Sequence, residues 1–132
     1  MNFNYIKALK FLGESYFEIE DFVRAKFQLE ECKNVASKMD KELILDDSVI
    51  IRAQQILGKC YYELSDYTLA KEELEEALES TSLLDIQASI KLDLSKSLLE
   101  FNFFNDALKM AEEAYTFYKK DDKCKSCTFS KL

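Results

Sequence analysis

The segment that decides the fold reads Leu57-Gly58-Lys59-Cys60-Tyr61-Tyr62-Glu63-Leu64-Ser65-Asp66-Tyr67, and Ala70 follows it. An earlier segment repeats the pattern as Leu12-Gly13-Glu14-Ser15-Tyr16-Phe17-Glu18-Ile19-Glu20-Asp21-Phe22, with Ala25 in the same register. A third and weaker copy reads Leu94-Ser95-Lys96-Ser97-Leu98-Leu99-Glu100-Phe101-Asn102-Phe103-Phe104, followed by Ala107. Three copies in register indicate an internal repeat. The other patterns in the chain are interpreted by their positions in this repeat.

Each copy predicts a pair of helices joined by a short turn. In the second copy, apolar residues recur at helical spacing on both sides of Asp66, a residue type that caps helices by accepting from free backbone amides. A glycine inside a helix costs about 1 kcal/mol relative to alanine, so Gly13 and Gly58 at equivalent places predict close packing. We expect the small residues of each first helix to face the alanine of the second helix, in the pairs Gly13 with Ala25, Gly58 with Ala70, and Ser95 with Ala107.

Composition favours the same all-α fold. The 132 residues include no proline and only two glycines, whereas folds rich in sheets or loops need both at their turns. The predicted helices span residues 3–19, 21–41, 47–64, 66–80, 85–101 and 104–120. Residues 1–120 are therefore expected to form the helical repeat domain, and residues 121–132 a polar tail.

The repeated Leu-Gly, Tyr, Phe or Tyr, and Ala pattern resembles the tetratricopeptide repeat over about residues 3–120. The third copy is degenerate, with Ser95 for the glycine and Leu98 for the tyrosine. The copies are spaced more widely than the usual repeat of about 34 residues, which implies extended helices around Lys33–Lys41 and Asp47–Arg52. The resemblance implies a right-handed superhelical stack of about three hairpins, an α-solenoid. The alternative is an ordinary six-helix bundle without repeat geometry.

By this resemblance, the first helix of each pair lines a concave groove that binds a protein or peptide. The expected partner-binding residues are Lys7, Lys10, Phe17, Arg52, Gln55, Lys59, Tyr62, Lys96 and Leu99. Basic residues concentrated there, in a chain of net charge −7, favour an acidic segment or a free carboxylate as ligand. The alternative is that these lysines are only the solvated face of amphipathic helices.

Two functional classes remain open for such a module. The first is an adaptor or scaffold that recognises a partner segment, and the second is a regulatory module similar to the helical-repeat receptors of bacterial signal peptides. A receptor for the acidic tails of heat-shock chaperones is disfavoured. Lys10 matches that family's pattern, but Glu14 and Ile56 replace its asparagines, and Ser89 and Asp93 replace its last two basic residues.

The residues of this chain give little support for catalysis, for a cofactor or for a metal site. The chain has no histidine, which is the commonest general base and a common metal ligand. Cys124 and Cys127 have CxxC spacing but supply only two of the four ligands of a structural zinc site, and Cys32 and Cys60 are expected in the core. The net charge of −7 disfavours nucleic acid and anionic membranes. We expect no enzyme, no cofactor and no metal.

The end of the chain raises two further expectations. The last predicted helix carries Met110, Phe117 and Tyr118 beside the stripe Leu108, Ala111, Ala114 and Tyr115. Because repeat arrays need a polar terminal cap, this helix predicts either a longer array or pairing with another subunit. Cysteines without signs of secretion indicate the cytoplasm, and the alternative is peroxisomal import through the terminal Ser130-Lys131-Leu132.

Overall fold

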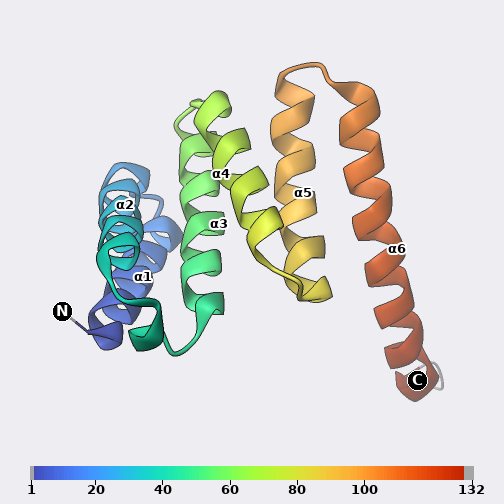
Figure 1. Cartoon of the computed structure of the whole chain (residues 1–132). Coiled ribbons are helices and arrows are strands. Elements are labelled where there is room, and N and C mark those ends of the chain that lie inside the picture. The colour runs from blue at the N-terminus through green and yellow to red at the C-terminus, as the bar shows by residue number, and fades with distance from the viewer. Residues whose placement is uncertain (1, 130–132) are drawn as a thin grey trace. The chain divides into compact units, whose positions relative to one another are not determined.

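The computed structural model describes residues 2–129, with side chains as far as residue 120. Six α-helices follow one another along the chain (Figure 1), and residues 2–129 contain no strand. They are α1 (Phe3–Glu18), α2 (Phe22–Lys38), α3 (Asp47–Glu63), α4 (Tyr67–Ser80), α5 (Leu84–Glu100) and α6 (Phe104–Phe129), with the short 3-10 helix η1 (Lys41–Leu43) between α2 and α3. The prediction of an all-α chain with six helices is confirmed.

The helices divide into two compact units, Met1–Thr81 and Ser82–Leu132. In the first unit α2 packs on α1, α3 packs on both α1 and α2, and α4 packs on α3. In the second unit α5 packs along α6. Every helix therefore packs on helices that lie close to it in the sequence.

The three helical hairpins share one turn geometry. Glu20, Ser65 and Asn102 have φ values of 66°, 65° and 61°, the left-handed conformation that residues other than glycine rarely adopt. In each turn the next amide donates to the carbonyl five residues before it, over 2.9, 2.8 and 3.0 Å respectively. This pattern closes a helix end by satisfying a terminal carbonyl. The repeat in the sequence is thus a repeat in local backbone structure.

Close approach of the paired helices explains the two glycines. A Cβ atom added to Gly13 would lie 2.5 Å from Cγ of Leu29, and one added to Gly58 would lie 2.8 Å from Cγ of Leu74. Both leucines are buried. The expected contact between Gly58 and Ala70 is therefore looser than the contact between Gly58 and Leu74. The atom of Ala70 near the added Cβ is its carbonyl oxygen, at 3.5 Å.

The third hairpin has other residues at the same two positions. Ser95 replaces the glycine, and Ala111 stands where the leucine stands in the other copies. Ser95 is buried and Ala111 is half-buried. The glycine–leucine contact is therefore a feature of the first two hairpins.

Two predicted helix boundaries are wrong, and the predicted N-cap at Asp66 lacks the expected side-chain hydrogen bond. Helix α2 ends at Lys38 and does not extend to residue 41, where the prediction placed its end. The backbone of α6 continues to Phe129, so residues 121–129 are helical where a tail was expected. Asp66 occupies the N-cap of α4 without a side-chain capping hydrogen bond, whereas the equivalent Asp21 accepts from the Arg24 amide at 3.3 Å. The side chains of the CxxC segment and all of residues 130–132 lie outside the described residues.

The core of the first unit is a continuous apolar cluster built from α1 to α4. Its fully buried side chains include Ile6, Leu29 and Leu57. Helix α3 is buried along most of its length because it packs on α1, α2 and α4. No helix in the described part of the chain is both long enough and apolar enough to cross a membrane.

Gly58→Ala should destabilise the protein by about 1–3 kcal/mol, because overpacking against Leu74 outweighs the gain of about 1 kcal/mol in helix propensity. Chemical denaturation measures the free energy of unfolding. In a Leu74→Ala background the same change should become neutral or stabilising, since the clash is gone. A Gly58→Ala protein as stable as the parent would show that the helices do not need this approach.

Candidate functional site

The expected binding residues of the first unit lie on α1 and α3, two helices that pack against each other. The Lys59 Nζ atom lies 5.9 Å from the centre of the Phe17 ring, which joins the two helices at the surface. Phe17 packs edge-on against Phe22, with ring centres 5.3 Å apart, and Tyr62 packs on Tyr67 at the same distance. Equivalent positions in two copies thus hold equivalent aromatic pairs.

The side chain of Arg52 is hydrogen-bonded to a buried neighbour on the same helix. Its Nη1 atom donates to Oε1 of Gln55 at 3.1 Å, and Gln55 is only 1% exposed. Arg52 itself is exposed. Gln55 therefore positions the guanidinium from inside, which differs from the expectation that it contacts a ligand directly.

Lys10 is less available than the other expected basic residues. Its side chain is 14% exposed, and its Nζ atom lies 3.3 Å from Oε1 of Glu14 and 4.2 Å from the centre of the Phe11 ring. The ion pair offsets much of the lysine's charge. Lys7 and Arg52, both exposed, and the half-buried Lys59 consequently carry the positive character of this face.

Lys96 and Leu99 belong to the second unit, where both are exposed on α5. The nine expected residues are thus divided between the two units. The seven in the first unit form what we call the α1–α3 face: Lys7, Lys10, Phe17, Arg52, Gln55, Lys59 and Tyr62.

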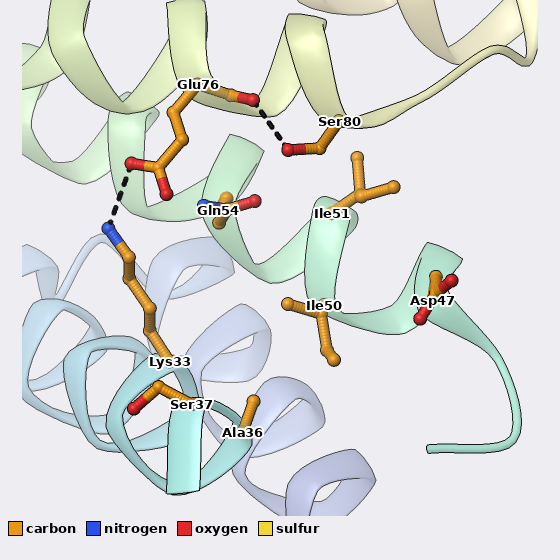
Figure 2. A pocket seen from close by; sticks show the side chains of 9 residues that line it. All are labelled: Lys33, Ala36, Ser37, Asp47, Ile50, Ile51, Gln54, Glu76 and Ser80. Atoms are coloured by element: carbon orange, nitrogen blue, oxygen red, sulfur yellow. Dashed lines mark hydrogen bonds and ion pairs between the residues drawn. The ribbon is translucent and has the colours of Figure 1, made fainter. Parts of the chain in front are cut away.

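A cavity that the sequence did not indicate lies between α2, α3 and α4. Its volume is about 300 Å³, and Figure 2 shows Ile50 and Ile51 on α3 between side chains from the two neighbouring helices. The lining residues are Lys33, Ala36, Ser37, Asp47, Ile50, Ile51, Gln54, Glu76 and Ser80. Most of the lining is therefore polar.

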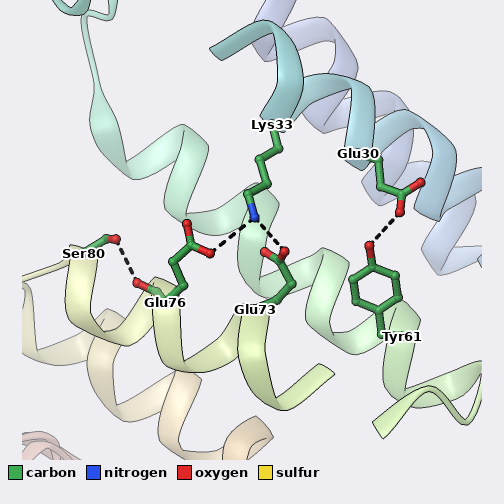
Figure 3. Close-up of polar contacts among 6 residues, drawn as sticks. All are labelled: Glu30, Lys33, Tyr61, Glu73, Glu76 and Ser80. Carbon is green, nitrogen blue, oxygen red and sulfur yellow. Dashed lines mark hydrogen bonds and ion pairs between the residues drawn. The ribbon is translucent and has the colours of Figure 1, made fainter. Parts of the chain in front are cut away.

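Beside this cavity, Lys33, Glu73 and Glu76 form a group of ion pairs that connects α2 to α4 across α3 (Figure 3). We call these three residues the strap. Lys33 Nζ lies 2.6 Å from Oε1 of Glu73 and 3.3 Å from Oε2 of Glu76. A second link joins α3 to α2, because the Tyr61 hydroxyl donates to Oε2 of Glu30 at 2.6 Å. These contacts hold the first two hairpins together through polar groups as well as through the core.

Burial dominates the electrostatics of the strap. It raises the pKa of Glu73, although the ammonium of Lys33 opposes the shift. The Glu73 side chain is 13% exposed, and its Oε2 atom is buried without a hydrogen-bond partner. Burial alone would lower the pKa of Lys33, but Glu73 and Glu76 outweigh it and the pKa is raised.

The two described cysteines are poor candidates for chemistry. Burial raises the pKa of the Cys32 thiol to about 11 and that of Cys60 to about 12, so both stay protonated at neutral pH. A thiolate is the form that attacks electrophiles and binds metals. Among the residues with described side chains, no group of three or more His, Cys, Asp or Glu is placed to hold a metal ion.

Comparisons with known proteins identify no family for this chain. The chain matches no protein-family model, and a search of curated proteins gives no significant match. The resemblance to tetratricopeptide repeats therefore depends on the repeated residues and the repeated turns.

Lys33→Met should lower the free energy of unfolding by about 1–2 kcal/mol, because it leaves Glu73 buried without a countercharge. The estimate stays below that of a fully buried pair since Lys33 is partly exposed. Lys71→Met removes an i,i+4 pair with Glu75 on the surface of α4 and should cost under about 0.5 kcal/mol. Equal losses in the two variants, measured by urea denaturation, would contradict the structural role of the strap.

The raised pKa of Glu73 also predicts a pH dependence. The folded state binds this proton more readily than the unfolded state, so protonation of Glu73 adds stability as the pH falls from about 7 towards 4.5. The stability of the parent relative to Glu73→Gln should therefore rise over that interval. The control is Glu72→Gln, which removes a carboxylate at an exposed neighbouring position of the same helix. A flat difference for Glu73→Gln would mean that its carboxyl group titrates normally.

Proposed function

We propose that the chain is a tetratricopeptide-like repeat domain, with its hairpins stacked as a right-handed solenoid, that binds a partner protein through the α1–α3 face. The observation that carries this proposal is the recurrence of one turn at Glu20, Ser65 and Asn102, each with the same φ and the same closing hydrogen bond. The three turns fall at equivalent places of the three sequence copies, which is what stacked repeats of one hairpin would produce. Repeat domains of this kind bind extended segments of other proteins on the surface formed by their first helices.

The chemistry of the face favours an acidic segment with apolar side chains. Arg52 is held forward by Gln55, and Lys59 lies beside the Phe17 ring, so charge and aromatic surface are adjacent. Guanidinium and ammonium groups recognise carboxylates, and the aromatic rings offer apolar contact beside them. A positive patch on a chain of net charge −7 also steers an acidic partner towards this face.

The test compares acidic peptides that contain Phe or Leu with matched peptides in which Lys replaces Asp and Glu. Fluorescence anisotropy should show binding of the acidic set, weakened by added salt because the charges are exposed. Arg52→Glu combined with Lys59→Glu should reduce that affinity at least about tenfold, while circular dichroism stays helical. The salt dependence should fall with the affinity.

A control variant with the same change in net charge separates local recognition from general attraction. Lys38→Glu with Lys41→Glu alters two exposed lysines at the end of α2 and on η1, neither of which belongs to the α1–α3 face. It should leave the affinity within about twofold, since only charges near the ligand act strongly at ordinary salt. Equal loss in both double variants, or equal binding of acidic and basic peptides, would refute the proposed face.

A further inference from the structure

Gln54 is a polar side chain at a core position of the first unit. It is 6% exposed and lines the cavity between α2, α3 and α4 (Figure 2). Its side-chain amide has no hydrogen-bond partner within residues 2–120, whereas the neighbouring Gln55 bonds to Arg52. Burying an amide without a hydrogen bond costs stability, so a buried amide is normally paired. This amide is therefore free to bond to a group that enters the cavity.

The first copy of the repeat shows that the fold does not require a polar residue here. Leu9 stands 45 positions before Gln54, at the same place of the repeat, and is also 6% exposed. Apolar packing alone therefore fills this place in the first hairpin. A glutamine in the second hairpin gives up part of that packing, which indicates a role in recognition.

A cavity of the second unit has the same position in the third hairpin. It lies between α5 and α6, and its volume is about 440 Å³. Six of its lining residues stand 37 positions after lining residues of the first cavity: Leu84, Gln87, Ala88, Lys91, Glu113 and Phe117. The two cavities are therefore one feature of the repeated hairpin.

An ammonium group meets a carboxylate in the cavity of the third hairpin. Lys91 Nζ lies 3.1 Å from Oε2 of Glu113, and these two residues are the equivalents of Gln54 and Glu76. A glutamine side chain is neutral and is one bond shorter than that of lysine. The second hairpin thus keeps the glutamate, but its first helix does not supply the ammonium.

The lining of the first cavity also favours a cation. It carries the carboxylates of Asp47 and Glu76 and the ammonium of Lys33. The charge of Lys33 is shared, because its Nζ atom lies 2.6 Å from Glu73 and 3.3 Å from Glu76. The cavity consequently has an excess of negative charge, which attracts a cation and disfavours an anion.

We propose that the cavity between α2, α3 and α4 binds the primary ammonium group of an alkyl amine. The ammonium donates to the amide oxygen of Gln54 and to the carboxylate of Glu76. The methylene chain lies against Ile50 and Ile51, which line the same cavity. A free amine and a lysine side chain of another protein share this chemistry. The site has no residue in common with the α1–α3 face.

Nuclear magnetic resonance of the full chain tests the site with n-pentylamine. Saturable shifts should appear in the side-chain amide of Gln54 and in the methyl groups of Ile50 and Ile51, with a Kd of about 1–10 mM for a ligand of so few atoms. The uncharged n-pentanol should bind at least about fivefold more weakly, because it cannot form an ion pair with Glu76. No pentylamine shifts at these residues, or equal binding of pentanol, would overturn the proposal.

A second probe distinguishes the two sources of the ammonium. Nα-acetyl-lysine amide carries the same ammonium on a four-carbon chain that ends in a peptide backbone. Binding at least as tight as that of pentylamine would identify a lysine side chain of a partner protein as the ligand. Binding of pentylamine alone would identify a free amine.

Two matched substitutions on α4 separate the site from general attraction by charge. Glu76→Gln should weaken pentylamine binding at least about fivefold, because it removes the carboxylate of the site. Glu72→Gln makes the same change at an exposed position outside the cavity and should alter the affinity by less than about twofold. Circular dichroism shows that both variants remain helical. Equal effects of the two substitutions would overturn the proposal.

Exchange of residues between the second and third copies tests the origin of the site. Gln54→Lys supplies the ammonium from the chain itself, as in the third hairpin, and should abolish the pentylamine shifts on α3. Lys91→Gln should do the reverse and produce pentylamine shifts on α5 and α6 that the parent protein lacks. This second variant decides the matter even if Gln54→Lys fails to fold. Retained binding in a folded Gln54→Lys protein, or no new shifts in Lys91→Gln, would overturn the proposal.

Discussion

The contact between a glycine on one helix and a leucine on the next decides how closely the first two hairpins close. Gly13 under Leu29 and Gly58 under Leu74 leave no room for a single added methyl group. The helix pair therefore has one preferred distance, and the turn that joins the helices must fit that distance. Glu20 and Ser65 take the left-handed conformation at those turns in spite of its cost for residues with side chains. Close packing and strained turn are two parts of one constraint.

The sequence predicted the parts of the fold that repeat and are local. Helical periodicity and the Leu-Gly pattern located six helices and three hairpins, because each signal depends on residues within one or two turns of each other. The cap at Asp66 failed since the residue type only permits a side-chain hydrogen bond, and the equivalent Asp21 makes one. Periodicity placed the alanines on the inner side of each hairpin but did not reveal the leucine one turn further on as the closest neighbour.

Contacts between hairpins were beyond the reach of sequence patterns. Lys33 and Glu73 are 40 positions apart, and nothing in the spacing of either residue marks the other as its partner. Gln55 was grouped with the surface residues by register, yet it is buried and supports Arg52. A helix such as α3, which packs on three others, buries polar residues that a two-sided amphipathic pattern assigns to the surface. The sequence predicted on which side of its helix a residue lies, but it did not predict which residue of another helix it contacts.

Helix α3 carries both a polar link to α2 and part of the α1–α3 face. Tyr61 contacts α2 through Glu30, and Arg52 and Lys59 lie on the same helix. The neighbouring helices therefore fix the orientation of α3 from several sides. Side chains held on a rigid helix lose less freedom on binding than side chains on a loop, so a face of this kind recognises a segment at lower entropic cost.

The local nature of helix packing has a consequence for how the chain acquires its structure. Helices α1 and α2, α3 and α4, and α5 and α6 pair as neighbours in sequence, so the loops that must close between them are short. Closing short loops loses little chain entropy, and proteins with such low contact order fold within about microseconds to milliseconds. Each hairpin supplies its own starting point for folding. The same design also limits long-range cooperativity, so a substitution in one hairpin reaches its distant neighbours only through the helices in between.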